Sequence, residues 1–333
     1  MDIGILDQSP ILAGQTAGEA LRSTIELAKA ADRWGFSRYW IAEHHDSPGL
    51  ACSSPEVLIA SVAAHTERIR VGSGGVLLPH YSPYKVAETF HMLEGLHPHR
   101  IDLGIGRAPG GMPLSSQAIR YGRPKDTAPD AFARMLGELG AHLRDDLPPE
   151  HPLAPLRATP IVGTIPEVWL LGSSDFSGRA ASTFGASFSF AHFLNGEDGY
   201  EVVRRYYEQF QPGPLGTVPR ANVCVHVICA DTDDAAERLA CVLDLRLLRL
   251  EQGDYRRSFP TLKEAEAQVY EPYERARISE NRKRMIVGGP ERVRRKLEQF
   301  ARDYGINEVL ALTLTPNPES RWRSYELLAD MVN

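Results

Sequence analysis

Short apolar runs alternate with longer helical patterns throughout this chain, and this alternation constrains the fold more than any other feature of the sequence. Ile3–Leu6 has the character of a strand, and Thr16 stands three residues before Glu19, which is the spacing of a capping box. Apolar residues at helical spacing then continue to Gly35. The first four units repeat at roughly thirty residues per strand and helix, the size of a βαβ crossover. The pattern therefore predicts a parallel sheet covered by helices.

Serine–proline pairs indicate where two further helices begin. Ser54-Pro55 and Ser82-Pro83 each follow an apolar run of strand length. Serine is a preferred N-cap residue, and proline is favoured at the first helical position because its missing N–H is not needed there. We therefore expect one helix to begin at Pro55 and another at Pro83, each capped by its serine.

Eight runs of strand length can be identified along the chain, and each is followed by a helical pattern. Eight such units close into a barrel more readily than they spread into an open sheet. We therefore predict an α/β fold, a (β/α)₈ TIM barrel, formed by a single domain over residues 1–333. The expected strands are Ile3–Leu6, Arg38–Ala42, Ile69–Gly74, Ile101–Ile105, Val168–Leu171, Ala186–Phe190, Asn222–Cys229 and Glu308–Leu314.

Two connections are too long to be simple loops with one helix. Residues 106–165, rich in proline and glycine, follow the fourth expected strand, and residues 231–307 follow the seventh. Within the second, Gln252–Arg284 is dense in charge and is expected to be helical. Both segments leave the C-terminal end of a strand, which is the catalytic face of such barrels. We therefore expect long insertions after strands four and seven that serve as lids over a site.

Composition excludes several classes of function. A formal net charge of −6 argues against general affinity for nucleic acid or for an anionic membrane. No apolar stretch reaches the length of a transmembrane helix, and the first residues do not resemble a signal peptide. The four cysteines form no C-x-x-C pair, and we expect them to be reduced thiols. These features indicate a cytoplasmic protein.

The run Glu43-His44-His45 stands where the second expected strand ends, so its polar side chains belong at the barrel mouth. An ordinary polar loop would explain the run equally well. A metal site is a further alternative, but zinc requires three or four ligands. The other candidate histidines, His97 and His99, precede the fourth strand and are expected on the opposite face. Alternation along the chain predicts that His44 faces differently from both its neighbours.

A second signal is the glycine-rich run that ends the fourth expected strand. Gly104 and Gly106 remove side chains near the mouth, so a flat ring could approach the backbone closely there. A dinucleotide-binding fingerprint is rejected, because Pro109 occupies the place of its third glycine. The simpler reading is a tight turn, with Arg107 as a solvated charge.

The third signal is Gly172-Ser173-Ser174, with Ser177 shortly after, between the fifth expected strand and a helix. Free backbone N–H groups and hydroxyls at a helix start form a cradle for phosphate. Serine at such a position is more often only a cap. Phosphate sites of barrels most often follow strands seven and eight, so this placement departs from the common pattern.

Taken together and in this order, the motifs resemble the bacterial luciferase-like flavin monooxygenases over nearly the whole chain. Any one match is weak, but seven in the right order are specific. The matching runs are Tyr39–His45, Val71–Pro79, Ser82-Pro83 with Glu88, Arg100–Gly110, Leu171–Ser174, Phe190–Phe193 and Gly288–Val293.

The resemblance implies FMN lying across the barrel mouth. The Gly-Ser-Ser run and Arg107 would hold its phosphate, and His44, with His45 as second choice, would act near the reactive edge of the flavin. Members of this family commonly carry a non-proline cis peptide under the flavin ring, which would be Gly74–Gly75 here. Members are often dimers, so a homodimer is expected.

The chain also differs from the light-emitting members, which carry a reactive cysteine where Gly106 stands. Substrate and light emission therefore do not carry over. The expected activity is oxidation of a small organic substrate by reduced FMN and molecular oxygen, with a separate reductase supplying the flavin. Three alternatives stay open: deazaflavin-dependent hydride transfer, flavin binding without catalysis, and a metal-dependent hydrolase that uses His44 and His45.

Overall fold

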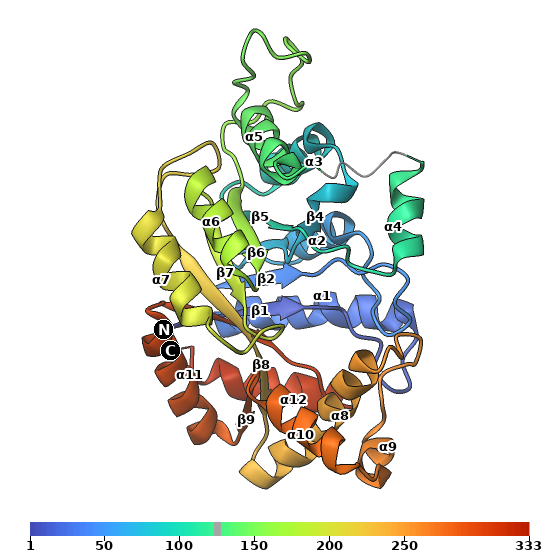
Figure 1. Ribbon diagram of the computed structural model, residues 1–333. Helices are drawn as coiled ribbons and strands as arrows, with labels where there is room; N and C mark the ends of the chain where they lie inside the picture. The colour runs from blue at the N-terminus through green and yellow to red at the C-terminus, as the bar shows by residue number, and fades with distance from the viewer. Residues whose placement is uncertain (123–127, 333) are drawn as a thin grey trace.

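A computed structural model describes residues 1–122 and 128–332 of the chain. Its centre is a closed barrel of parallel strands (Figure 1). The eight barrel strands are β1 (Asp2–Asp7), β2 (Arg38–Ile41), β3 (Arg70–Ser73), β5 (Ile101–Gly106), β6 (Glu167–Gly172), β7 (Ser187–Ala191), β8 (Ala221–Cys229) and β10 (Glu308–Leu312).

Closure of the barrel depends on the last strand, β10, which pairs with β1 on one side and with β8 on the other. Asp2 stands opposite Glu308 in the first pairing, and Val309 stands opposite Val223 in the second. The barrel strands are buried along most of their length, as expected for a parallel sheet covered by helices. The predicted (β/α)₈ barrel and all eight of its strands are therefore confirmed.

Two short strands were not predicted. β4 (Val76–Leu77) pairs with the end of β5, and β9 (Met285–Gly288) pairs with the C-terminal half of β8. β4 has too few residues to show a pattern in the sequence, and β9 lies inside the long insertion, outside the strand–helix repeat. Both lie near the C-terminal ends of barrel strands.

The helices that surround the barrel begin largely where the sequence indicates. Thr16 accepts a hydrogen bond from the Glu19 backbone N–H, and the Glu19 carboxylate accepts one from Thr16. The next two helices begin at the expected prolines, but the side chains of Ser54 and Ser82 make no capping hydrogen bond. The surrounding helices are α1 (Ala17–Trp34), α2 (Pro55–Ala64), α3 (Pro83–Leu96), α5 (Ala131–Arg144), α6 (Asp175–Phe184), α7 (Gly199–Gln209), α8 (Asp233–Glu251), α11 (Pro290–Tyr304) and α12 (Pro318–Ala329).

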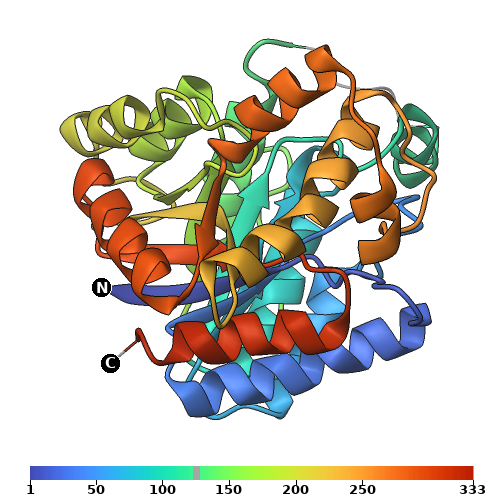
Figure 2. The same cartoon turned by 90° about the horizontal axis from the view of Figure 1, so that it is seen from below.

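The first and last helices meet, which completes the outer ring. α12 lies beside α1 (red beside blue in Figure 2), and the rings of Trp34 and Trp322 pack edge to face with centroids 5.4 Å apart. Amphipathic helices bury their apolar stripes against the strands in this arrangement. No helix of the described residues is both long and apolar enough to span a membrane.

Both long insertions leave the C-terminal ends of their strands, as predicted. The first contains α4 (Pro113–Arg120), and its residues 123–127 lie outside the described part. The second contains α9 (Leu262–Ala267) and α10 (Pro272–Arg282). The prediction that Gln252–Arg284 is helical is wrong for residues 252–261, 268–271 and 283–284. Gly253, with φ of +83°, and Pro260 interrupt the helical pattern in the first of these stretches.

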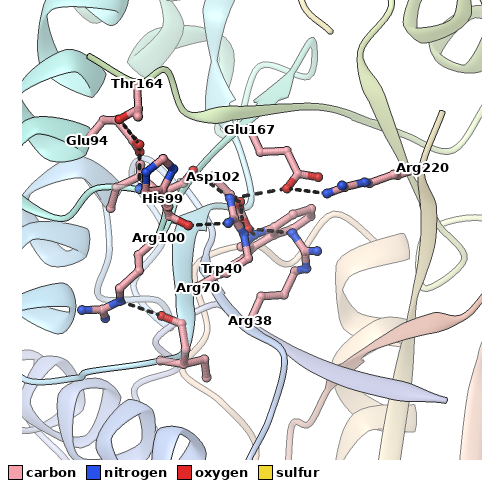
Figure 3. A network of polar contacts seen from close by, with 12 residues as sticks. Arg38, Trp40, Arg70, Glu94, His99, Arg100, Asp102, Thr164, Glu167 and Arg220 are labelled. Carbon is pink, nitrogen blue, oxygen red and sulfur yellow. Dashed lines mark hydrogen bonds and ion pairs between the residues drawn. The ribbon is translucent and has the colours of Figure 1, made fainter. Parts of the chain in front are cut away.

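Charged side chains fill the N-terminal end of the barrel (Figure 3). The carboxylate of Asp102 accepts hydrogen bonds from Arg38 Nη1 at 2.7 Å, Trp40 Nε1 at 2.9 Å and Arg70 Nε at 2.8 Å. Arg38 also donates to Glu308 at 2.7 Å. These carboxylates raise the pKa of Arg38 despite its burial. This end is therefore closed by mutually neutralised charges.

Candidate active site

A cavity of about 540 Å³ lies at the other end of the barrel, where the strands end. Its walls come from the ends of β2, β3, β5 and β6 and from the first turn of α6. Ten residues were predicted to form the site, and nine of them line this cavity. They are His44, Gly74, Gly75, Gly106, Arg107, Gly172, Ser173, Ser174 and Ser177.

The tenth, His45, lines a neighbouring cavity of about 420 Å³. The two cavities share several lining residues, so they form connected parts of one recess. The shared residues are Gln8, His44, Gly110, Phe193 and Leu194. His44 therefore stands between the two spaces, whereas His45 faces only the second.

The glycines at the ends of β3 and β5 allow their backbones to pack closely. The Gly74–Gly75 peptide is cis, as expected. A side-chain carbon added to Gly75 would come within 2.7 Å of the carbonyl oxygen of Gly104. One added to Gly104 would come within 2.0 Å of the Ser73 carbonyl oxygen, so Gly104 serves strand packing and does not line the cavity. Gly74, Gly75 and Gly106 leave the wall itself free of side chains.

The turn from β6 into α6 is the place where the sequence predicts a phosphate cradle. A side-chain carbon on Gly172 would lie 2.1 Å from the Ser177 hydroxyl, so only glycine allows this turn to close. Ser174 occupies the N-cap position, yet its side chain makes no capping hydrogen bond. The Ser177 N–H donates to the Ser174 carbonyl oxygen at 3.1 Å, whereas the N–H groups of the first two helical residues have no partner within the helix. These donors and hydroxyls together suit an anion.

Arg107 stands beside this turn although it comes from a different strand. It directly follows β5, and its guanidinium carbon lies 3.9 Å from the centroid of the Phe176 ring in the first turn of α6. None of the ion pairs among the described residues includes Arg107. The cation and the free N–H groups therefore converge on one place. The carboxylate in the same turn, that of Asp175, pairs with Arg179 and Arg205 and not with Arg107.

Glu43 explains why the two histidines differ. Its buried carboxylate accepts hydrogen bonds from Tyr81 at 2.6 Å and from the Leu77 N–H at 3.0 Å, and it contacts His45 Nε2 at 2.6 Å. Glu43 therefore braces the barrel wall and holds the ring of His45. The sequence left this role open, and the structure shows it.

His44 has no comparable partner. Its Nδ1 atom is buried without a hydrogen bond among the described residues. Burial, together with the neighbouring His45, lowers the pKa of His44 to about 4. The ring is therefore neutral at physiological pH, in contrast to the near-neutral titration usual for histidine. His44 lines both cavities, so a ligand in the recess would meet its ring.

The metal-site alternative lacks ligands. Among the residues that the structure describes, no group of three or more histidine, cysteine, aspartate or glutamate side chains could hold a metal ion. His99 lies at the closed end of the barrel, where its carbonyl oxygen accepts a hydrogen bond from Arg70. All four cysteines are free.

Sequence reasoning missed several residues of the recess. Gln8 follows β1 directly, and Phe193 follows β7, so both occupy strand-end positions that the barrel fold makes part of the mouth. Their position just after a predicted strand was the feature of the sequence that could have identified them. Arg246 and Arg284, which line the second cavity, lie within the long insertion and gave no such signal.

A model of the luciferase-like monooxygenase family matches residues 1–308 of the chain. The chain belongs to the luciferase-like monooxygenase family. An uncharacterised Bacillus subtilis protein, YwcH, is 48% identical over 99% of this chain and 98% of its own. The N-acetyl-S-alkylcysteine monooxygenase of the same organism is 39% identical, again over 99% and 98% of the two chains.

Solved structures of luciferase-like proteins share the barrel. The crystal structure of apo-MsnO8 superimposes with a TM-score of 0.89, at 37% identity over 99% of this chain and 98% of that one. Two more distant structures show likeness of fold alone. One is the FMN-bound oxygenating constituent of a Pseudomonas putida 3,6-diketocamphane monooxygenase, with a TM-score of 0.69 and 22% identity over 100% and 98% of the two chains. The other is an F420-dependent secondary alcohol dehydrogenase, with a TM-score of 0.69 and 14% identity over 100% and 99%.

Proposed function

We propose that this luciferase-like protein uses reduced FMN and molecular oxygen to oxidise a small organic substrate. The observation that carries the proposal is the recess at the mouth, which combines an unneutralised cation and a helix-start cradle at one place with an unpaired histidine nitrogen at another. A flavin mononucleotide has the matching parts, namely a phosphate and a flat ring system.

The residues of the recess fit this group. Arg107, the free N–H groups at the start of α6 and the hydroxyls of Ser173, Ser174 and Ser177 would hold the phosphate. The side-chain-free wall at Gly74–Gly75 would lie against the ring. Reduced flavin, when bound, supplies the electrons that activate oxygen, and the protein supplies position, electrostatics and exclusion of water.

His44 is proposed to handle the proton. Its neutral ring can accept a proton at Nδ1, the atom that has no partner. Because the pKa of His44 is about 4, the ring cannot store a proton at neutral pH and must pass it on. The contact with Glu43 holds the ring of His45 outside the proposed flavin pocket, so only His44 borders that pocket.

Reduced flavin is proposed to come from a separate reductase. The glycine run at β5 lacks the third glycine of a dinucleotide fingerprint, because Pro109 stands there.

The relative that acts on N-acetyl-S-alkylcysteine is named for a small substrate, which suits the volume of the recess here.

A deazaflavin-dependent hydride transfer is the second candidate, because the same fold occurs in an F420-dependent dehydrogenase. Titration with reduced FMN, oxidised FMN and F420 separates the two by affinity. Single-turnover reactions with reduced FMN under ¹⁸O₂ then test the chemistry. Label in the product supports a monooxygenase, and anaerobic turnover with reduced F420 supports the alternative. Tight FMN binding without conversion of any tested substrate would leave only a flavin-binding role.

A further inference from the structure

The second cavity beside the proposed flavin site is lined mainly by apolar side chains. One wall is formed by α8 and by residues that follow it in the insertion after β8, and the other walls come from the segments that follow β2, β5 and β7. His44 borders it, so a molecule placed there can reach the same histidine as the flavin pocket. Its main apolar residues are Leu50, Leu243, Leu247, Leu250, Phe259 and Leu314.

One buried cation interrupts this apolar lining. Arg246 lies on α8 and is only 6% exposed, and none of the ion pairs among the described residues includes it. Its Nη1 donates one hydrogen bond, to the Arg257 carbonyl oxygen at 3.1 Å. The nearby carboxylate of Asp254 pairs with Arg257 instead, at 2.9 Å. Burial and the neighbouring Arg249 lower the pKa of Arg246.

Other buried arginines of this protein are neutralised. Arg38 contacts Asp102 and Glu308, each at 2.7 Å, and Arg321 contacts Asp7 at 2.7 Å. Buried charges are normally paired because leaving one unpaired is costly. Arg246 is an exception, and it faces a cavity that adjoins the candidate active site.

We propose that Arg246 binds the carboxylate of a substrate whose remaining part is apolar. The planar guanidinium offers donors in a geometry that matches a carboxylate, and the leucine and phenylalanine side chains accept the apolar body. Arg284, the other arginine that lines this cavity, already lies 3.5 Å from Glu251, so the free positive charge belongs to Arg246. The inference rests on the proposed function and names its substrate class.

A purely structural role for Arg246 would be to tie down the loop that contains Arg257. That role requires a hydrogen bond but no preference for a charged ligand. Preference for a carboxylate over the matching amide therefore separates the two roles. The comparison needs no knowledge of the natural substrate.

The experiment titrates FMN-loaded protein by calorimetry with straight-chain carboxylates from butanoate to decanoate and with the corresponding amides. FMN binding is measured first, so a failure of the proposed function is seen independently. The same titrations are repeated without flavin, in Arg107→Met protein, because Arg107 would otherwise offer a second anion site. The variants are Arg246→Met and Arg246→Lys, and the control is Arg238→Met, an exposed arginine on the same helix that pairs with Glu266.

We expect the wild-type protein and the Arg238→Met control to bind at least one carboxylate about tenfold or more tightly than its amide. Arg246→Met should abolish this preference, and Arg246→Lys should retain part of it because the charge remains. Equal binding of carboxylates and amides by wild-type protein would overturn the proposal, as would the absence of carboxylate binding or a preference that survives in Arg246→Met. The wild-type comparison decides the matter even if a variant fails to fold.

Discussion

The two ends of the barrel treat charge in opposite ways. At the N-terminal end, Arg38 pairs with Asp102 and Glu308. Arg70 pairs with Asp102 as well, so these charges neutralise one another (Figure 3 shows the contacts of Asp102). At the C-terminal mouth, Arg107 lies outside every described ion pair, and the Nδ1 atom of His44 has no partner. The polar groups of the closed end bind one another and stabilise the fold, whereas those of the open end are available to bind a ligand. This division follows the location of active sites in such barrels.

The largest expected effect concerns His44 at the open end. His44→Ala should lower turnover with reduced FMN by roughly 10²–10⁴-fold, which is typical of lost acid–base help. Affinity for FMN should change little, because the residues proposed to hold the phosphate are untouched. Stopped-flow turnover and flavin titration measure the two quantities. A variant that binds FMN normally and turns over at the parental rate would show that His44 is structural.

The matching change at the closed end should affect stability instead. Asp102→Asn removes the carboxylate that buried Arg38 shares with half-buried Arg70, and breaking a buried pair costs about 3–5 kcal/mol. Urea denaturation should show this loss, while the remaining folded protein keeps its FMN affinity. Arg107→Met at the open end is the control, with a stability change within about 0.5 kcal/mol. Equal losses of unfolding free energy in the two variants would contradict the proposed difference between the two ends.

A smaller effect is expected in the pH dependence. Burial places the pKa of His44 at about 4, below its ordinary value of 6.5, so the folded protein favours the neutral ring. The unfolded chain binds the proton more readily, and this group therefore destabilises the fold as pH falls from about 6.5 towards 4. Turnover should show no His44-dependent break between about pH 5 and pH 8. A break near pH 6.5 that disappears in His44→Gln would contradict this.

The barrel was predictable because its units repeat. Apolar runs of strand length recur with helical patterns and proline-marked helix starts, and all eight barrel strands were found from them. β4 was missed because two residues leave no pattern. β9 is as long as β2 and β3, but it lies inside the long insertion after β8 and outside the strand–helix repeat. Residues 252–261 were assigned to a helix from charge density, which does not report the turn at Gly253.

The site was predictable where its residues lie at strand ends. His44, Arg107 and Gly172 each stand at or just after the end of a barrel strand, and the fold brings these ends together. The second cavity was not predictable in this way. Arg246 comes from a helix of the long insertion, and only tertiary packing shows that it is buried without a carboxylate.

The most direct test of the open end compares FMN with riboflavin. The two ligands differ only in the phosphate, and each charge-assisted hydrogen bond is worth ~1.5–3 kcal/mol. Fluorescence titration of wild-type protein should give at least about tenfold tighter binding of FMN. The ratio should shrink in Arg107→Met and persist in Arg179→Met, whose exposed arginine on α6 already pairs with Asp175. Equal affinity for FMN and riboflavin would contradict the account.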